Sequence, residues 1–316
     1  MGLISHKEFA EAVVRSLSNL IVGKDDVIRM VCYTLLVGGH VLFEDNPGLG
    51  KTTLAKGFAS ALGCEFRRIQ FTADLLPADI TGTFVLDGVG GGFRFVKGPV
   101  FTQVLLADEI NRSPPKTQSA LLEAMQERQV SVENSTFTLP SPFMVLGTQN
   151  PIEYEGTYPL PEAQLDRFTV RLRMGYPDEE DEVGILELKE KVGDSLRGVE
   201  RVADPDVVVR LQGGVDSVYA HPDIKRYVVK LAAATRVAKG VDVGVSPRGT
   251  IHLLRMAKAR AICLGRDYVT PEDVKSVAVP VLAHRLILSP EYSIRGVTQE
   301  EVVEGVLKSV PVPKVD

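Results

Sequence analysis

The order of apolar and polar positions divides the chain into a mixed first half and a helical second half. In the first half, short apolar runs typical of strands alternate with segments whose apolar residues recur every three or four positions, as in helices. The predicted strands cover 40–43, 64–72, 104–108, 143–149 and 169–174. The predicted helices cover 5–19, 25–37, 54–62, 115–126 and 160–168.

The second half begins after Gly175-Tyr176-Pro177, which has the composition of a hinge. Five acidic residues at 178–182 follow, and we interpret them as the solvated first turn of a helix, where negative charge suits the helix dipole. Helices are predicted over 179–192, 204–219, 222–239, 247–264, 271–284 and 298–309. A length of 316 residues suits two domains, and we predict them at 1–175 and 176–316.

Two segments of the first half are predicted to form hairpins inserted into the larger domain, near 82–98 and near 130–142. The first has strand-like arms on either side of a glycine-rich tip at 88–92, and the second has its turn at 133–135. The glycine tip could touch a substrate or be a solvated turn.

Composition narrows the functional class. No apolar run reaches membrane-spanning length, and the first residues lack the apolar stretch of a signal peptide, so we expect a cytoplasmic protein without membrane insertion. The three cysteines show no metal-binding spacing, which agrees with a reducing compartment. A net charge of −5 and few aromatic residues make a nucleic-acid partner less favoured.

A phosphate-binding loop is predicted at 44–53, between the strand 40–43 and the helix 54–62. Gly48 and Gly50 allow backbone amides to approach a polyphosphate, Lys51 brings positive charge, and the Thr52 hydroxyl is a Mg²⁺ ligand. The predicted nucleotide-binding residues of the loop are Asn46, Pro47, Gly48, Leu49, Gly50, Lys51, Thr52 and Thr53. The alternative is a glycine-rich turn that binds no ligand.

One residue departs from the usual pattern G-x-x-x-x-G-K-[ST], because Asp45 stands at the first glycine. Aspartate tolerates left-handed backbone geometry better than most residues, so the turn can survive. Its carboxylate must point away from the phosphates, or nucleotide binding would weaken.

Polar residues also end two other predicted strands. The strand 104–108 ends in Asp108 and Glu109, whose side chains would point opposite ways if the strand geometry continued. Asp108 is then placed to hold hydrated Mg²⁺ and Glu109 to deprotonate an attacking water. Asn150 follows the strand 143–149 and could bind that water or the γ-phosphate. The alternative for each is an ordinary strand end.

Two further positions are candidates for contacts with a nucleotide. Val22-Gly23, just before the first predicted strand, could line an adenine pocket or simply pack in the core. Arg248 lies in the first turn of the helix 247–264, after Ser246 as N-cap and Pro247 at the first position. A positive charge there opposes the helix dipole, so Arg248 either binds an external anion or is a solvated surface residue.

Taken together, these motifs resemble the MoxR-type ATPases of the AAA+ superfamily over almost the whole chain. The most specific segments are Leu106 to Arg112, Thr148 to Pro151, Gly156 to Phe168 and Ser246 to Arg248. The resemblance implies an α/β P-loop domain built as a parallel-sheet sandwich, followed by a smaller all-helical lid domain. It also implies ATP or ADP with Mg²⁺ as ligands, and assembly into a homo-oligomeric ring that is usually hexameric.

The resemblance further assigns roles to single residues. It makes Asn150 the sensor 1 residue, Arg167 the arginine finger that reaches a neighbour's γ-phosphate, and Arg248 the sensor 2 residue, acting in the same or an adjacent subunit. The catalytic set is then Glu109, Asn150, Arg167, Arg248 and Lys51. The two hairpins would face the ring's pore or substrate.

In function, the resemblance implies a chaperone-like or metal-inserting ATPase that acts on a client protein, beside a partner with a von Willebrand factor A domain. Two alternatives stay open: a nucleotide-regulated scaffold with little turnover, and a nucleic-acid motor.

Overall fold

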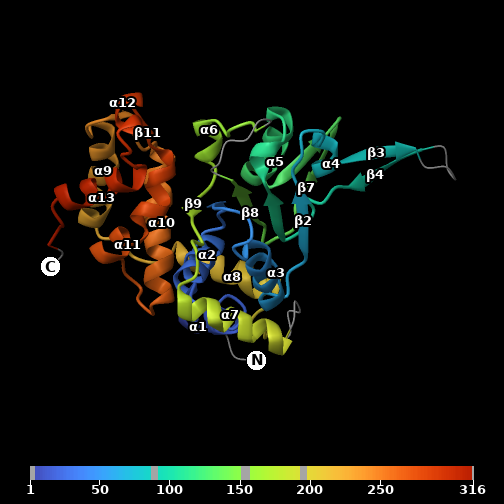
Figure 1. The fold of residues 1–316 in the computed structure, drawn as a ribbon, viewed down its shortest axis with the longest axis horizontal. Coiled ribbons are helices and arrows are strands. Elements are labelled where there is room, and N and C mark those ends of the chain that lie inside the picture. Colours follow the sequence, from blue (N-terminus) through green and yellow to red (C-terminus); the bar gives the residue numbers. More distant parts are fainter. Residues whose placement is uncertain (1–3, 87–91, 151–156, 193–197, 315–316) are drawn as a thin grey trace.

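The computed structural model describes residues 4–86, 92–150, 157–192 and 198–314. Its centre is a five-stranded sheet in the order β2-β5-β8-β1-β9, in which all neighbouring strands are parallel (Figure 1). The strands are β1 (Val41–Glu44), β2 (Phe66–Gln70), β5 (Val104–Asp108), β8 (Met144–Gln149) and β9 (Val170–Leu172). Each overlaps a predicted strand, and the α/β class with a parallel sheet is confirmed.

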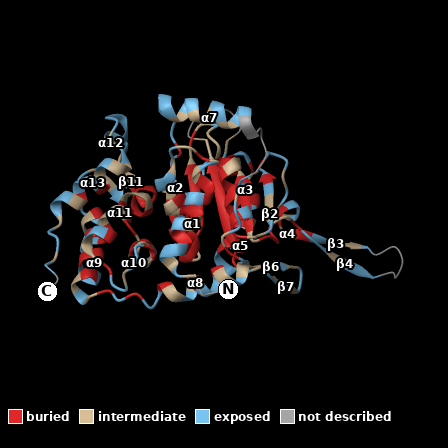
Figure 2. Cartoon of the chain, turned by 90° about the horizontal axis from the view of Figure 1, so that it is seen from below, coloured by how far each residue is buried: buried red, intermediate tan, exposed pale blue. Residues whose placement is uncertain are grey.

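The sheet is covered on both faces because its strands are apolar on both (Figure 2). In β5, Val104 and Leu106 belong to one buried core, whereas Leu105 and Ala107 belong to the other. Successive side chains of a strand point to opposite faces, so one continuous apolar run supplies both cores. The covering helices are α1 (His6–Ser18), α2 (Asp25–Leu36) and α3 (Lys51–Ala61) in the first core, and α4 (Pro77–Thr81) and α5 (Pro115–Glu127) in the second.

Two antiparallel hairpins extend from the sheet domain beside α4 and α5 (Figure 1). They are β3 (Gly82–Leu86) with β4 (Phe93–Lys97), and β6 (Gln129–Val132) with β7 (Ser135–Thr138). The rings of Phe95 and Phe137 stack with centroids 4.1 Å apart, which joins the two hairpins. The tip at 87–91 lies outside the described residues.

The second half of the chain is mainly helical, as predicted. The helices α7 (Glu179–Val192) and α8 (Pro205–Val215) lie beside α1 to α3, and the others form a bundle whose buried side chains belong to the same core as those of α1 to α3 (Figure 1). That bundle, called the lid bundle below, contains α9 (Pro222–Arg236), α10 (Pro247–Cys263), α11 (Pro271–Leu282), η2 (Ala283–Arg285), α12 (Pro290–Ile294) and α13 (Gln299–Ser309). The exact domain boundary at 175/176 stays a proposal.

The lid bundle differs from the all-helical prediction in one detail. It also contains an antiparallel ribbon of β10 (Val241–Val243) and β11 (Ile287–Leu288). Strands of three and two residues are too short to produce a recognisable alternation of apolar and polar positions, which explains why the sequence did not predict them. In the described ranges, no helix combines the length and apolar character needed to cross a bilayer.

Candidate functional site

The predicted phosphate loop connects the end of β1 to the first turn of α3. Gly48 and Gly50 have φ values of +88° and +83°, a backbone geometry that favours glycine. A side chain built on Gly48 would meet nothing within 4 Å, so this part of the loop faces open space. Because α3 begins at Lys51, its free N–H groups point into the same region, which is where an anion binds most favourably.

The Lys51 side chain folds back over the loop. Its Nζ donates to the carbonyl oxygens of Asp45 (3.1 Å) and Asn46 (2.8 Å). Burial lowers the pKa of Lys51, while the carboxylates of Asp45, Asp108 and Glu109 act in the opposite direction. The ammonium group of Lys51 has therefore lost part of its hydration, and it lies close to three acidic side chains.

The carboxylate of Asp45 points away from the phosphate side of the loop. It accepts hydrogen bonds from the backbone amides of Met174 (2.5 Å) and Gly175 (3.2 Å). Gly175 is the first residue of the predicted hinge and Met174 directly precedes it, and Asp45 is itself buried. The residue that departs from the usual loop pattern thus ties the loop to the hinge, and the predicted outward orientation is confirmed.

This orientation predicts that Asp45→Gly, although it restores the usual glycine, destabilises the protein without improving nucleotide binding. The buried Met174 amide would lose its acceptor, at a cost of about 1–3 kcal/mol in the free energy of unfolding, and the exposed Gly175 amide would lose one at a smaller cost. Denaturant unfolding measures the loss, with Asp242→Gly at an exposed lid position as the control. A variant of unchanged stability and tighter nucleotide binding would contradict the interpretation.

The two predicted acidic residues separate because the strand ends between them. Asp108 is the last residue of β5, whereas Glu109 has a left-handed φ of +56°. The strand geometry on which the sequence argument depended therefore does not continue to Glu109. Thr148 at the end of β8 connects the pair, because its hydroxyl donates to Asp108 Oδ1 (2.6 Å) and accepts from the Glu109 amide (2.8 Å).

Three polar side chains that the sequence argument missed also bind these carboxylates. Arg68 Nη2 lies 2.6 Å from Asp108 Oδ2, and Gln70 Nε2 donates to Glu109 Oε2 (2.8 Å). Arg112 Nη1 is 3.1 Å from the same Glu109 oxygen. The register of β2 against β5 places Gln70 opposite Asp108. Sequence alone does not give strand order, so only the fold could reveal the contacts of Arg68 and Gln70.

The loop and the ends of β5 and β8 surround a cavity of about 380 Å³. Its walls include Lys51, Thr52, Asp108, Glu109 and Asn150, so the structure brings these five predicted residues together. The Thr52 hydroxyl and the Asp108 carboxylate are hard oxygen donors, the type that Mg²⁺ prefers. Among the described residues no group of three or more His, Cys, Asp or Glu could form a complete metal cage. Mg²⁺ usually binds one or two carboxylates together with phosphate oxygens.

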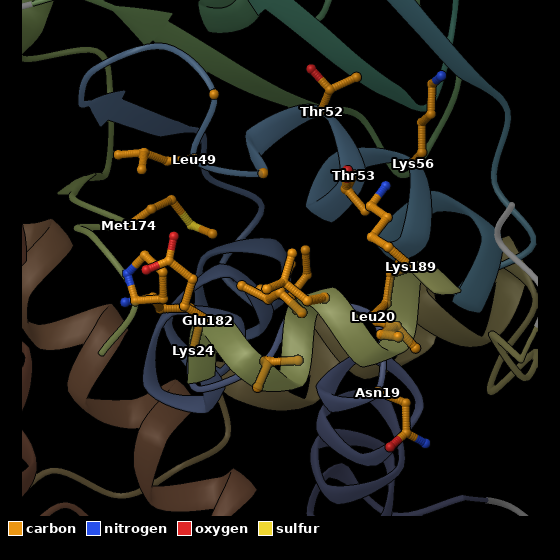
Figure 3. A pocket seen from close by; sticks show the side chains of 18 of the residues that line it. Asn19, Leu20, Lys24, Leu49, Thr52, Thr53, Lys56, Met174, Glu182 and Lys189 are labelled. Carbon is orange, nitrogen blue, oxygen red and sulfur yellow. The ribbon is translucent and has the colours of Figure 1, made fainter. Parts of the chain in front are cut away.

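A second cavity of about 770 Å³ adjoins the loop on its other side. The helix α7 crosses it, with Leu49 and Met174 at one end and Thr53 and Lys189 at the other (Figure 3). Val22 lines this cavity. The sequence argument did not anticipate that α7 would cover the site.

Two predicted residues, Gly23 and Asn46, line neither cavity, although Val22 and Pro47 beside them line the second one. A side chain built on Gly23 would come within 1.7 Å of Asp181 Oδ2 on α7, so only glycine allows this close approach. Asn46 Nδ2 donates to the Tyr176 hydroxyl (3.3 Å). The acidic segment 178–182 begins α7 as predicted, with Asp178 Oδ1 accepting from the Asp181 amide (2.8 Å).

The structure does not bring Arg167 and Arg248 to the phosphate cavity. They line a separate cavity of about 180 Å³, together with Arg128, His252 and Arg255. Gly38 to His40, which precede β1, form part of its wall, whereas the phosphate loop follows β1. The two groups of residues therefore lie at opposite ends of the same strand.

The chain matches two known families. Residues 40–170 match the family described as "ATPase family associated with various cellular activities (AAA)", and residues 233–306 match the family described as "AAA lid domain". The first match spans the sheet and its loops, and the second includes α10 and α11.

Individual proteins are similar over nearly the whole chain. "Uncharacterized protein YeaC" of Bacillus subtilis is 46% identical, over 95% of this chain and 93% of that protein. "Chaperone MoxR1" of Mycobacterium tuberculosis is 41% identical, over 100% of this chain and 85% of that protein. A solved structure from Cytophaga hutchinsonii, described as a presumed ATPase, has a TM-score of 0.91 at 39% identity and covers 98% of this chain and 96% of that chain.

Proposed function

Because the chain belongs to the MoxR-type AAA+ ATPases, we propose that it binds ATP with Mg²⁺ and hydrolyses it at sites shared between neighbouring subunits. The 380 Å³ cavity beside the loop would take the phosphates, and the 770 Å³ cavity under α7 would take the base and ribose. ADP would remain in the same place after hydrolysis.

Five residues of one chain would carry the chemistry in the phosphate cavity. Thr52 and Asp108 would hold Mg²⁺, which, when bound, offsets the negative charge of the phosphate oxygens. Lys51 adds a second positive charge to the same oxygens. Glu109 would take the proton of the attacking water, and Asn150 on the same wall would orient that water.

The location of Arg167 is the observation that carries the shared-site proposal. Arg167 and Arg248 lie at the start of β1, away from the loop at its end, so Arg167 cannot reach the phosphates of its own chain without a large rearrangement. An arginine finger delivered by a neighbouring subunit accounts for this separation. Arg248 lines the same cavity as Arg167, which favours a role for Arg248 in the neighbouring subunit's site as well.

For the biological role, we propose chaperone-like remodelling of a client protein by a hexameric ring. The 41% identity to a protein named as a chaperone supports this class, and metal insertion into the client is a special case of it. A partner with a von Willebrand factor A domain and a cytoplasmic location remain proposals from the family resemblance. The net charge of −5 disfavours a nucleic-acid motor.

Steady-state phosphate release at several protein concentrations tests the shared site. Because each site would need two subunits, the turnover per chain should rise with concentration until assembly is complete. Sedimentation under the same conditions should place the rise at the concentration at which the oligomer forms. Turnover that is absent at every concentration would favour the nucleotide-regulated scaffold, and turnover independent of assembly would contradict the shared site.

A further inference from the structure

A buried arginine of the lid bundle, Arg285, reaches the segment that carries Arg167. Arg285 ends η2, and its side chain is only 1% exposed. A guanidinium group has five N–H donors, and burial is costly unless acceptors surround them. Most of those acceptors come from residues 166–169, here called the finger segment, between α6 (Glu162–Leu165) and β9.

Arg285 binds the finger segment on both sides of Arg167. On the N-terminal side, its Nε donates to Asp166 Oδ1 (2.8 Å) and its Nη2 to the Asp166 carbonyl (3.2 Å). On the C-terminal side, Nη2 donates to the Phe168 carbonyl (2.7 Å) and Nη1 to the Thr169 carbonyl (3.5 Å). Arg285 thus binds the backbone on both sides of Arg167, and His284 Nε2, also in η2, lies 3.1 Å from the Phe168 carbonyl oxygen.

The same carboxylate also joins the finger segment to the start of α10. Ser246 Oγ lies 3.3 Å from both oxygens of Asp166, and Arg248 Nη1 lies 3.7 Å from Oδ2. A side chain built on Gly249 would come within 2.8 Å of Arg285 Cδ, so the first turn of α10 packs directly on Arg285. Arg167 and Arg248 are thus held around a single ion pair.

A histidine of α10 accepts another hydrogen bond from Arg285. His252 Nδ1 lies 2.7 Å from Arg285 Nη2. Burial, followed by the positive charges of Arg285, Arg248 and Arg255, lowers the pKa of His252 to about 3. The ring is therefore neutral near pH 7 and keeps the lone pair that accepts from Arg285.

The finger segment is also attached to the sheet domain, because the Phe168 side chain is fully buried in the second core and lies against Gly147 of β8. The Thr169 amide donates to the His40 carbonyl (2.9 Å), and β9 pairs with β1 directly after it. Asp166 and Phe168, on either side of Arg167, instead direct acceptors to Arg285. Residues 166–169 are therefore held by the lid bundle and the sheet domain together, and the Asp166 carboxylate is directed to the lid bundle.

We propose that Arg285 is a positioning residue that fixes the arginine finger to the lid bundle of its own subunit. A change in lid position would then move Arg167 into or out of the neighbouring subunit's site. This inference rests on the proposed shared site and adds what controls the finger. Arg285 itself does not contact nucleotide in this arrangement.

Arg285→Lys tests the role, because lysine keeps the charge but cannot bind several acceptors with a planar fork. Misplacing a catalytic group by about 1 Å can cost roughly 10²-fold in rate, so we expect a fall in kcat of that order. The affinity for a fluorescent ATP analogue and the assembly by sedimentation should be unchanged. Asp166→Asn should behave in the same way, and it serves as the second variant if Arg285→Lys unfolds.

The matched control is Arg266→Lys, which removes a two-pronged contact with buried Asp273 inside the lid bundle (2.6 Å for each hydrogen bond). Its stability should fall, but its kcat should not fall with it. If Arg285→Lys lowers nucleotide affinity as much as kcat, or if Arg266→Lys loses kcat equally, Arg285 has only a structural role.

Mixed oligomers separate this inference from the proposed function. Arg285→Lys subunits keep an intact Glu109, and Glu109→Gln subunits keep an intact finger, so mixing them should restore turnover well above that of either variant alone. Mixing Arg167→Ala with Glu109→Gln should restore turnover in the same way. If only the second mixture recovers, the role of Arg285 is wrong; if neither recovers, the shared site itself is wrong.

Discussion

Replacing Arg167 with alanine is expected to lower kcat by roughly 10³–10⁵, the range that arginine fingers supply in related phosphoryl transfer. The finger acts by offsetting the charge that develops on the transferred phosphoryl group, which is an effect on the transition state. In the proposed site, ground-state binding would use the loop, α3 and α7, which surround two cavities that Arg167 does not line. The affinity for ATP should therefore remain close to that of the unchanged protein, and phosphate release combined with equilibrium nucleotide binding measures both quantities.

The structure offers a clear control for this experiment. Arg226 on α9 is exposed and pairs only at the surface with Asp223, so Arg226→Ala should leave kcat unchanged. Equal loss of turnover and nucleotide affinity in Arg167→Ala would place the residue in the site of its own chain, or would indicate misfolding. The first result would be incompatible with a finger delivered by a neighbour.

Much of the fold could be predicted because local and global signals agree. Each sheet strand is an apolar run, because a strand that is buried on both faces needs apolar residues at nearly every position. Helix starts are equally local, as Ser246 shows by capping α10 at the predicted residue. Helix ends were less predictable: α8 stops at Val215 rather than 219, after two glycines that weaken helical geometry.

The candidate site was predictable only where one contiguous segment carries the signal. The loop from Asn46 to Thr53 and the pair Asp108-Glu109 are such segments, since a strand end and the following turn place them together. Gln70 and Arg68 were missed, because their contacts with Glu109 and Asp108 exist only when β2 lies next to β5. Strand order arises from packing of the whole domain, and no residue spacing encodes it.

The same limit applies to Arg285 and to α7. Arg285 is separated from Asp166 by 119 positions, and nothing near it in sequence suggests a buried ion pair. The helix α7 was predicted as a helix, yet its position over the cavity depends on the hinge at Gly175 and on the close approach of Asp181 to Gly23. Contacts between residues far apart in sequence, such as Arg285 with Asp166, therefore cannot be predicted from local patterns.

Glu109→Gln is expected to bind ATP normally and to hydrolyse it about 10²–10⁴-fold more slowly, the usual contribution of a positioned general base. Glutamine has nearly the same shape and its carbonyl oxygen can still accept from Gln70, so the geometry of the strand end should be preserved. What it loses is the ability to take a proton from water. Single-turnover phosphate release at saturating ATP measures this step directly, and Glu123→Gln, an exposed residue of α5, is the isosteric control.

The outcome would also decide what the contacts of Glu109 mean. In the structure, Gln70 and Arg112 both bind Glu109 Oε2, so this oxygen must leave at least one of them before it can accept a proton from water. If Gln70→Ala changes kcat but Glu109→Gln does not, Gln70 would be the more important group and the general-base assignment would fail. If Glu109→Gln alone abolishes turnover, Glu109 is the base and its contact with Gln70 is not needed for hydrolysis.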